Sequence, residues 1–203
     1  LESYSRDPGE LYTRVQSEEG AGETLAGQFP SLRNPDLRQF IEHGPGAQLA
    51  ARLMGTGSAQ LVLDQVFHKQ PGRIVPTPWH QDTPFLQVRG MDMARVWTSC
   101  DPSPSGVTVE VVRGSHMWNV VYDTATMARS GVATSAEGDD FTYDGMGDDR
   151  LPMVPDVAAN RGSFDIMSWD VEPGDVVVFN GNVLHGAQGR EDHPHPRRAL
   201  AVM

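Results

Sequence analysis

From Leu61 onward the chain consists of short apolar runs that glycine and proline repeatedly interrupt. Runs of this length, rich in valine and aromatic residues, predict strands rather than helices. Six such runs are predicted, over residues 61–67, 93–99, 107–113, 163–169, 175–179 and 197–203. Many short strands joined by Gly/Pro turns are typical of a sandwich or barrel, so we expect a mainly β fold with a few flanking helices.

Apolar residues at helical spacing are found upstream of these strands. In the segment DLRQFIEH, which follows Pro35, the side chains of Leu37, Phe40 and Ile41 fall on one helical face. Residues 47–54 (AQLAARLM) predict a second short helix, which a glycine ends. The first thirty residues are polar, Gly-rich and weakly periodic, and they predict no defined element.

We expect a single domain over residues 1–203, because this length suffices for one sizeable core and no linker or repeat is visible. It would combine a helical flank over about 1–60 with a β core over about 61–203. Residues 120–160 are largely irregular, with one predicted helical turn at TATMARS, and such a long stretch is more often a lid or binding loop than a plain connector. The chain starts without methionine and stops inside a predicted strand, so we expect residues to be missing at both ends.

Charge and composition exclude several classes of partner. The formal net charge of -11 argues against nucleic acids and anionic membrane surfaces, because no basic stripe is present to bind phosphates. Six of the acids lie within residues 137–150, which we interpret as a solvated loop. No apolar run approaches the ~20 residues of a membrane span. Cys100 is the sole cysteine, which excludes an intrachain disulfide and predicts a cytoplasmic protein. The oligomeric state is not predicted.

The segment TPWHQDTPF (77–85) contains the first candidate site. In a strand, His80 and Asp82 would lie on the same face, roughly 6.6 Å apart along the chain. They are either a satisfied polar pair or two ligands that require a third, and the HxD pattern alone is common by chance. His185 follows a buried-looking strand in VEPGDVVVFNGNVLHGA and is the candidate third ligand. Two histidines and one carboxylate form a facial triad, which leaves three adjacent positions on iron open.

A second candidate group follows in HPHPRRALAV. Arg197 and Arg198 begin the last predicted strand, and a planar guanidinium binds a carboxylate through two hydrogen bonds. Neighbouring strand residues face opposite ways, so one of the two arginines points inward, and the pattern does not say which. The prolines beside His193 and His195 predict an exposed turn rather than further ligands.

The motifs, in their order along the chain, resemble the phytanoyl-CoA dioxygenase family of Fe(II)- and 2-oxoglutarate-dependent oxygenases. The resemblance covers about residues 61–203. It rests on Lys69-x-Pro71-Gly72, WHQD (79–82), RVWTSCDPSPSG (95–106), VVRGSHMW (111–118), PGDVVVFNGNVLHGA (173–187) and RRALAV (197–202). It implies a double-stranded β-helix, a cupin-like jelly roll whose two sheets enclose the metal.

The resemblance also implies roles for individual residues. His80, Asp82 and His185 would hold Fe(II), and Arg197 would bind the distal carboxylate of 2-oxoglutarate. Lys69 and Gln65 are at positions where some members make further contacts with this cosubstrate, although both could equally be ordinary strand residues.

Two differences from the family pattern accompany these roles. Many members have serine where this chain has Ala187, and the interval from His185 to Arg197 is longer by one residue. Loss of that hydroxyl would weaken cosubstrate binding by about 1 kcal/mol. Trp79 and Phe85 are candidates for the pocket wall, and Trp79 could equally be a core residue. His116 is interpreted as structural.

The reaction implied by the resemblance consumes O2 and 2-oxoglutarate and releases succinate and CO2 while a C–H bond of a small metabolite is hydroxylated. Related halogenases lack the carboxylate ligand, so Asp82 favours hydroxylation. One alternative is a cupin-like metal enzyme that does not use 2-oxoglutarate, and another is a non-catalytic metal- or small-molecule-binding jelly roll.

Overall fold

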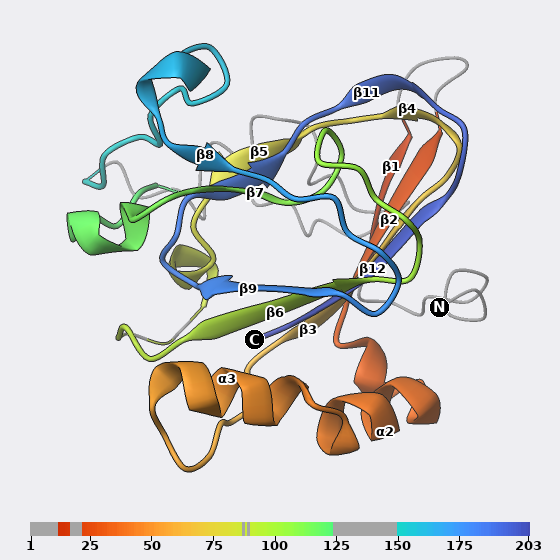
Figure 1. Ribbon diagram of the computed structural model, residues 1–203, viewed down its shortest axis with the longest axis vertical. Helices are drawn as coiled ribbons and strands as arrows, with labels where there is room; N and C mark the ends of the chain where they lie inside the picture. Colours follow the sequence, from red (N-terminus) through yellow and green to blue (C-terminus); the bar gives the residue numbers. More distant parts are fainter. Residues whose placement is uncertain (1–11, 17–21, 87, 89, 124–149) are drawn as a thin grey trace.

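The computed structural model describes residues 12–16, 22–86, 88, 90–123 and 150–203, which form three sheets of antiparallel strands (Figure 1). The larger sheet contains, in spatial order, β1 (Tyr12–Gln16), β2 (Glu23–Gln28), β3 (Asp64–Lys69), β12 (Arg197–Val202), β6 (Ala94–Ser99) and β9 (Val176–Asn180). The smaller sheet contains β5 (Thr77–His80), β10 (His185–Ala187), β7 (Glu110–Val112) and β8 (Ile166–Met167). A two-stranded sheet pairs β11 (Arg190–His193) with β4 (Gly72–Ile74).

Successive strands of the core alternate between the two main sheets. The chain passes from β3 in the larger sheet to β5 in the smaller, returns to β6, and then runs through β7 and β8 of the smaller sheet. It continues to β9 in the larger sheet, β10 in the smaller and β12 in the larger. Two facing sheets built by this alternation are a double-stranded β-helix, so the predicted jelly-roll fold is confirmed.

The space between the main sheets is filled by side chains that the period-2 alternation of each strand directs inward. Trp97 of β6 and Val177 of β9 come from the larger sheet, and Val109 and Val111 come from the region of β7. The other buried members of this cluster are Val171, Val183, Ala199 and Ala201. This inner cluster is the core against which the functional side chains are positioned.

Helices α2 (Pro35–His43) and α3 (Gly46–Met54) lie together below the larger sheet in Figure 1. Leu37 and Ile41 of α2 pack against the outer-face residues Leu25 and Val66, whereas Phe40, which the helical spacing placed on the same face, is 51% exposed. The Asn34 side chain caps α2 by accepting hydrogen bonds from two backbone N–H groups of its first turn, at 3.0 Å each. Both predicted helices are therefore confirmed. The short 3-10 helix η1 (Pro30–Leu32) precedes them.

The outer face of the smaller sheet is covered by the chain that follows residue 150. Trp79 and Val112 pack there with Val157 in a second buried cluster. In the 3-10 helix η4 (Arg161–Ser163), the Arg161 guanidinium donates two hydrogen bonds of 2.9 Å to the buried Glu110 carboxylate. This bidentate pair attaches the covering segment to β7. The remaining 3-10 helices are η2 (Thr83–Phe85) and η3 (Ser115–Trp118).

The N-terminal region differs from the expected helical flank. β2 pairs along its length with β3, and β1 pairs with β2, so the larger sheet extends upstream of residue 60. The segment ETLAGQ of β2 has no apolar run, because its buried positions, Thr24, Leu25 and Gly27, include a polar residue and a glycine. The hydrophobic pattern therefore does not predict this strand.

Several other elements differ from the sequence analysis in extent. The predicted strands over 107–113 and 163–169 are shorter, and β4, β5, β10 and β11 were not predicted as strands. The predicted helical turn at TATMARS and most of the acidic run over 137–150 lie outside the described residues. Across the described ranges, no helix is both long and apolar enough to span a bilayer.

Candidate metal centre

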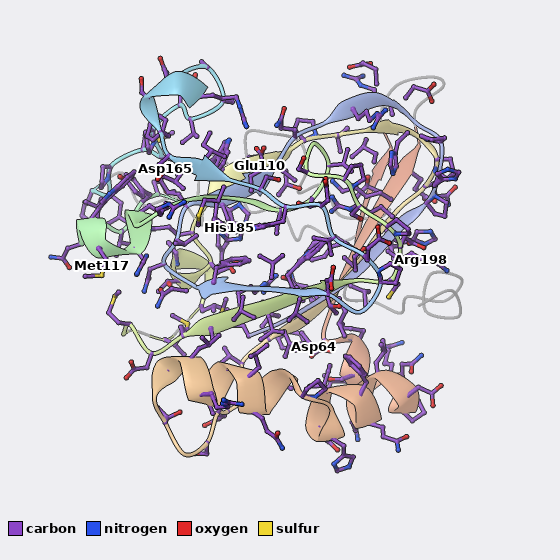
Figure 2. The ribbon with its side chains drawn as sticks, viewed as in Figure 1. Asp64, Glu110, Met117, Asp165, His185 and Arg198 are labelled. Carbon is purple, nitrogen blue, oxygen red and sulfur yellow. The ribbon has the colours of Figure 1, made fainter. Side chains whose placement is uncertain are left out.

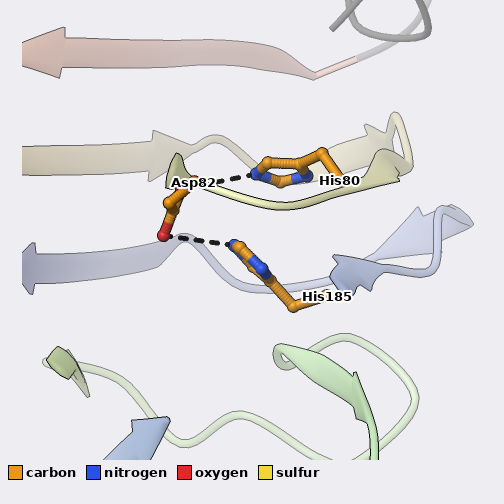
Figure 3. Close-up of side chains that lie close together, drawn as sticks. All are labelled: His80, Asp82 and His185. Carbon is orange, nitrogen blue, oxygen red and sulfur yellow. Dashed lines mark ion pairs between the residues drawn. The ribbon is translucent and has the colours of Figure 1, made fainter. Parts of the chain in front are cut away.

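Three side chains that are far apart in the sequence converge at one end of the jelly roll (Figure 3). His80 ends β5, His185 begins β10, and the two residues are direct cross-strand partners. Asp82 follows two residues after His80. One ligand atom from each residue lies within 4.8 Å of the others. The His80 Nε2 to Asp82 Oδ1 distance is 3.7 Å and the His185 Nε2 to Asp82 Oδ2 distance is 3.6 Å. These separations are too long for hydrogen bonds and suit three ligands of one cation.

Backbone carbonyls determine which nitrogen of each imidazole faces the centre. His80 Nδ1 lies 2.7 Å from the Pro78 carbonyl oxygen, and His185 Nδ1 lies 3.0 Å from that of Val183. A carbonyl can only accept, so each Nδ1 carries the proton and donates it. The Nε2 lone pairs are consequently directed at the shared point, as in metal-binding histidines that donate from their other ring nitrogen.

The protonation states of the three groups match a divalent metal. Burial lowers the pKa of His185 to about 3 and also lowers the pKa of His80, so both imidazoles are neutral near pH 7. Burial acts to raise the pKa of the Asp82 carboxyl, but the Arg95 guanidinium lowers it, and the net pKa lies below its usual value. Asp82 Oδ2 is buried without a hydrogen-bond partner in the described part of the chain. A metal ion would satisfy this oxygen, so the donor set fits the facial triad.

Gly186 allows β10 and β5 to approach closely enough for this convergence. A Cβ atom added at Gly186 would lie 2.9 Å from the Thr77 carbonyl oxygen and 3.3 Å from Trp79 Cδ2. We therefore expect Gly186→Ala to force the two ligand-bearing strands apart, lowering the free energy of unfolding by ~1–3 kcal/mol. Metal affinity should also fall, because His80 and His185 are cross-strand partners here.

Thermal unfolding and a Mn(II) titration measure both effects of Gly186→Ala. Gly162→Ala is the matched control, since a Cβ at that position would meet nothing within 4 Å. Unchanged metal affinity in the Gly186 variant would contradict the geometric role of this glycine.

Two buried cationic side chains lie side by side in the barrel at the start of β12. Arg197 is the direct cross-strand partner of Lys69 on β3, and both side chains are buried. Arg197 Nη1 donates to the Val107 carbonyl, and its guanidinium carbon lies 5.8 Å from the centre of the Trp97 ring. Its Nε is buried without a hydrogen-bond partner among the described residues. Burial lowers the pKa of Arg197 to about 10, so it stays charged near pH 7.

Lys69 is the second basic side chain of this pair. Its Nζ donates to the Val75 carbonyl at 3.2 Å. Burial, followed by the charge of Arg197, lowers the pKa of Lys69 well below its ordinary value. Lys69 can therefore donate hydrogen bonds to an anion, and a bound negative charge would favour its protonated form.

Arg198 faces the other way, as strand alternation requires. Its backbone N–H donates to Asp101 Oδ2 at 2.7 Å, and its Nε and Nη2 donate to the same carboxylate at 3.0 and 2.6 Å. Figure 2 shows Arg198 at the right edge of the molecule and His185 farther inside it. Arg197 is thus the arginine that the register of β12 directs into the barrel, which the sequence pattern could not decide.

Arg95 begins the motif RVWTSCDPSPSG, and no role was predicted for it from the sequence. This β6 residue is 4% exposed, and its Nε lies 3.7 Å from Asp82 Oδ2. Its Nη2 donates to the Gln65 side-chain oxygen on β3. The available signal was its position two residues before Trp97 in an apolar strand, which places both side chains on one face.

Of the two aromatic candidates for the pocket wall, Trp79 and Phe85, only Phe85 lies beside the candidate metal centre. Phe85 lies edge-on to the His80 ring with 6.1 Å between centroids, so it borders the centre. Trp79 belongs to the cluster on the outer face of the smaller sheet and is a core residue. Phe179 of β9 lies 4.7 Å from the His185 ring and was not predicted.

The two histidines of the last loop do not share one environment. His193 is buried, because β11 pairs with β4, which corrects the expectation of an exposed turn, whereas His195 is exposed as expected. Neither belongs to the group of candidate metal ligands among the described residues.

Gln81, between the two ligands of the HxD motif, links three segments near the centre. Its side chain is buried, and its Nε2 donates to the carbonyls of Val120 and Asn182 at 3.0 and 2.8 Å. Its Oε1 accepts from the Tyr122 N–H at 3.0 Å. The start of the irregular stretch over 120–160 is thereby attached to the turn that contains the candidate ligand Asp82, although residues 124–149 lie outside the described chain.

Comparison with solved structures shows the same fold in several proteins. AviO1 from Streptomyces viridochromogenes Tue57 is 20% identical with a TM-score of 0.65, and the match covers 100% of this chain and 77% of AviO1. EctD from S. alaskensis is 18% identical with a TM-score of 0.67, covering 99% of this chain and 64% of EctD.

The epimerase SnoN, solved with Fe3+, alpha ketoglutarate and nogalamycin RO, is 17% identical with a TM-score of 0.62, covering 100% of this chain and 70% of SnoN. No curated protein matches the chain. The family model described as phytanoyl-CoA dioxygenase (PhyH) matches residues 13–199. The chain therefore belongs to the phytanoyl-CoA dioxygenase family of non-haem iron, 2-oxoglutarate-dependent dioxygenases.

Proposed function

We propose that this chain hydroxylates a C–H bond of a small metabolite while 2-oxoglutarate and O2 are converted to succinate and CO2. Iron(II) would be held by His80, Asp82 and His185. The observation that carries the proposal is the convergence of these three donor groups within 4.8 Å at one end of the jelly roll. When bound, iron and the 2-oxo acid supply the activation of O2, and the side chains described above supply binding, orientation and exclusion of water.

The charge of the donor set supports iron(II) with an anionic cosubstrate. Two neutral imidazoles and one carboxylate cancel one of the two charges of the metal, so an anionic chelator is still attracted. The backbone acceptors of the two histidines hold their Nε2 atoms in place before a metal arrives. Such preorganised ligands bind without a cost in side-chain rearrangement.

Arg197 and Lys69 are the proposed site for the distal carboxylate of 2-oxoglutarate. Arg197 Nε is a buried donor without a described partner, and Lys69 lies directly across the strand pair. A carboxylate placed between them would receive charge-assisted hydrogen bonds in a buried setting, where they are strongest. Ala187 provides no hydroxyl for this carboxylate, so the two cations carry the proposed binding.

The proposal includes a small-molecule substrate rather than a nucleic acid or membrane, and a cytoplasmic location. The net charge of -11 supports the first part, since it disfavours polyanionic partners. The single exposed cysteine, Cys100, supports the second. The related SnoN is named an epimerase, so the reaction type needs a direct test.

Anaerobic reconstitution tests the metal and cosubstrate together. Adding Fe(II) and then 2-oxoglutarate to the purified protein should produce a visible metal-to-ligand charge-transfer band. Fe(II) alone and Zn(II) with 2-oxoglutarate serve as blanks. No band at saturating Fe(II) and 2-oxoglutarate would refute this proposed function.

A metabolite screen by succinate release, with mass spectrometry of the products, then identifies the substrate. Hydroxylation requires a product heavier by one oxygen atom, whereas an epimerised product keeps the mass of the substrate. A protein that binds 2-oxoglutarate and never releases succinate would instead be a binding protein.

A further inference from the structure

Arg95 carries unused hydrogen-bonding capacity directly beside the proposed metal ligands. Its side chain is 5% exposed, and the Asp82 carboxylate lies within ion-pair distance of its Nε, at 3.7 Å. Nη2 is occupied by the Gln65 side-chain oxygen. Nη1 is buried and has no hydrogen-bond partner among the described residues. A buried guanidinium with an unmet donor is costly, which indicates that a ligand supplies the missing acceptor.

The contact with Arg95 also orients the Gln65 amide. A guanidinium carries donors and no acceptor, so the Gln65 oxygen must face Arg95 and its NH2 group must face away. Gln65 shares the inward face of β3 with Lys69, since the two residues are four apart on one strand. Arg95 thus holds a second donor group in a defined direction inside the barrel.

This pair is distinct from the site proposed for the distal carboxylate. Gln65 is the cross-strand partner of Ala201, which lies four residues along β12 from Arg197. Four residues of strand span roughly 13 Å. The Trp97 ring is the cross-strand neighbour of Ala201 on the other side and contacts Arg197. Arg95 and Gln65 are therefore at the metal end of the barrel, and Arg197 and Lys69 are at the far end.

We propose that Arg95, together with the Gln65 amide that it orients, forms a carboxylate-binding site adjacent to the metal centre. This inference rests on the proposed function, because it takes the facial triad as the metal site. The carboxylate has two possible sources: the C1 carboxylate of the 2-oxo acid and an acid group of the primary substrate. The experiment separates these sources.

The first arm measures 2-oxo acid affinity on Mn(II)-loaded protein. 2-Oxopentanoate keeps the C1 carboxylate and replaces the distal one by a methyl group. If Arg95 binds the C1 carboxylate, Arg95→Gln weakens 2-oxoglutarate and 2-oxopentanoate binding by the same factor of at least ten. Arg197→Gln should weaken 2-oxoglutarate alone. Arg95→Lys, which retains the charge, should restore part of the affinity.

The second arm compares carboxylic acids with their amides as stimulators of succinate release. If Arg95 receives an acid group of the substrate, wild-type protein prefers the acids by at least tenfold, and Arg95→Gln loses this preference while its affinity for both 2-oxo acids is unchanged. Mn(II) affinity and thermal unfolding are followed in parallel for each variant.

Two results together would overturn the inference. The first is that Arg95→Gln keeps the wild-type affinity for both 2-oxo acids. The second is that wild-type protein shows no preference for acids over amides, or that Arg95→Gln retains this preference. A loss of Mn(II) affinity in Arg95→Gln that accounts for its whole loss of 2-oxo acid affinity would also overturn it, since Arg95 would then act through Asp82 alone. Failure of wild-type protein to bind 2-oxoglutarate would instead contradict the proposed function, so the two failures are distinguishable.

Discussion

His185→Ala abolishes Fe(II) binding and, with it, the charge-transfer band and succinate release. The substitution removes one of three ligands and leaves His80 and Asp82, which cannot complete the facial triad. We expect the loss of metal affinity to exceed the roughly 10- to 100-fold that typically follows the loss of an outer-shell partner of a metal ligand. The fold should survive, because the neutral His185 ring makes a single hydrogen bond to the described residues, to the Val183 carbonyl.

Equilibrium dialysis with Fe(II) under anaerobic conditions measures this effect, and circular dichroism verifies the fold. The matched control is His195→Ala, which removes an exposed histidine from the same C-terminal region. The control should bind iron like the wild type. A His185→Ala protein that still gives the band with Fe(II) and 2-oxoglutarate would show that the metal lies elsewhere.

Arg197→Gln raises the dissociation constant for 2-oxoglutarate by roughly 30-fold or more. Removing one partner of a buried, hydrogen-bonded charge pair costs ~2–5 kcal/mol, and each 1.4 kcal/mol is a factor of about ten in affinity. Iron affinity should change little, because Arg197 is not a member of the ligand group. The dissociation constant is read from a titration of the charge-transfer band.

Arg198→Gln is the control for this substitution, because it removes the neighbouring arginine of the same strand. Arg198 hydrogen-bonds Asp101, so its loss should lower the free energy of unfolding by ~1–3 kcal/mol. Its affinity for 2-oxoglutarate should equal that of the wild type. Equal effects of the two substitutions on 2-oxoglutarate affinity would exclude the assignment of Arg197 as the specific anchor.

Arg197 and Arg198 show what the local sequence pattern predicts and what it does not. Period-2 alternation required that one arginine face inward, and this local rule holds for any strand. Which one faces inward depends on the register of β12 against β3 and β6, where Arg197 is placed opposite Lys69. Register is set by contacts between strands that are more than a hundred residues apart in the chain, so it could not be obtained from the local pattern.

Arg95 and His193 illustrate a second limit. An arginine in a strand and a histidine that precedes a proline both have local patterns typical of the surface. Arg95 is buried because Asp82 and Gln65, from two other strands or turns, provide its partners. His193 is buried because β11 pairs with β4. Burial of a polar residue is decided by such distant partners and leaves little trace in its own neighbourhood.

The sequence by itself determined the mainly β class, helices α2 and α3, the family, and the order of the motifs that contain the candidate ligands. These properties follow from residue spacing and chain order, which are local. Only the tertiary structure decided that strands β1 and β2 extend the larger sheet, that Arg197 rather than Arg198 points inward, and that Arg95 lies against Asp82. These properties depend on which distant strands become neighbours, because side-chain partners across a barrel are brought together by the closure of the two sheets.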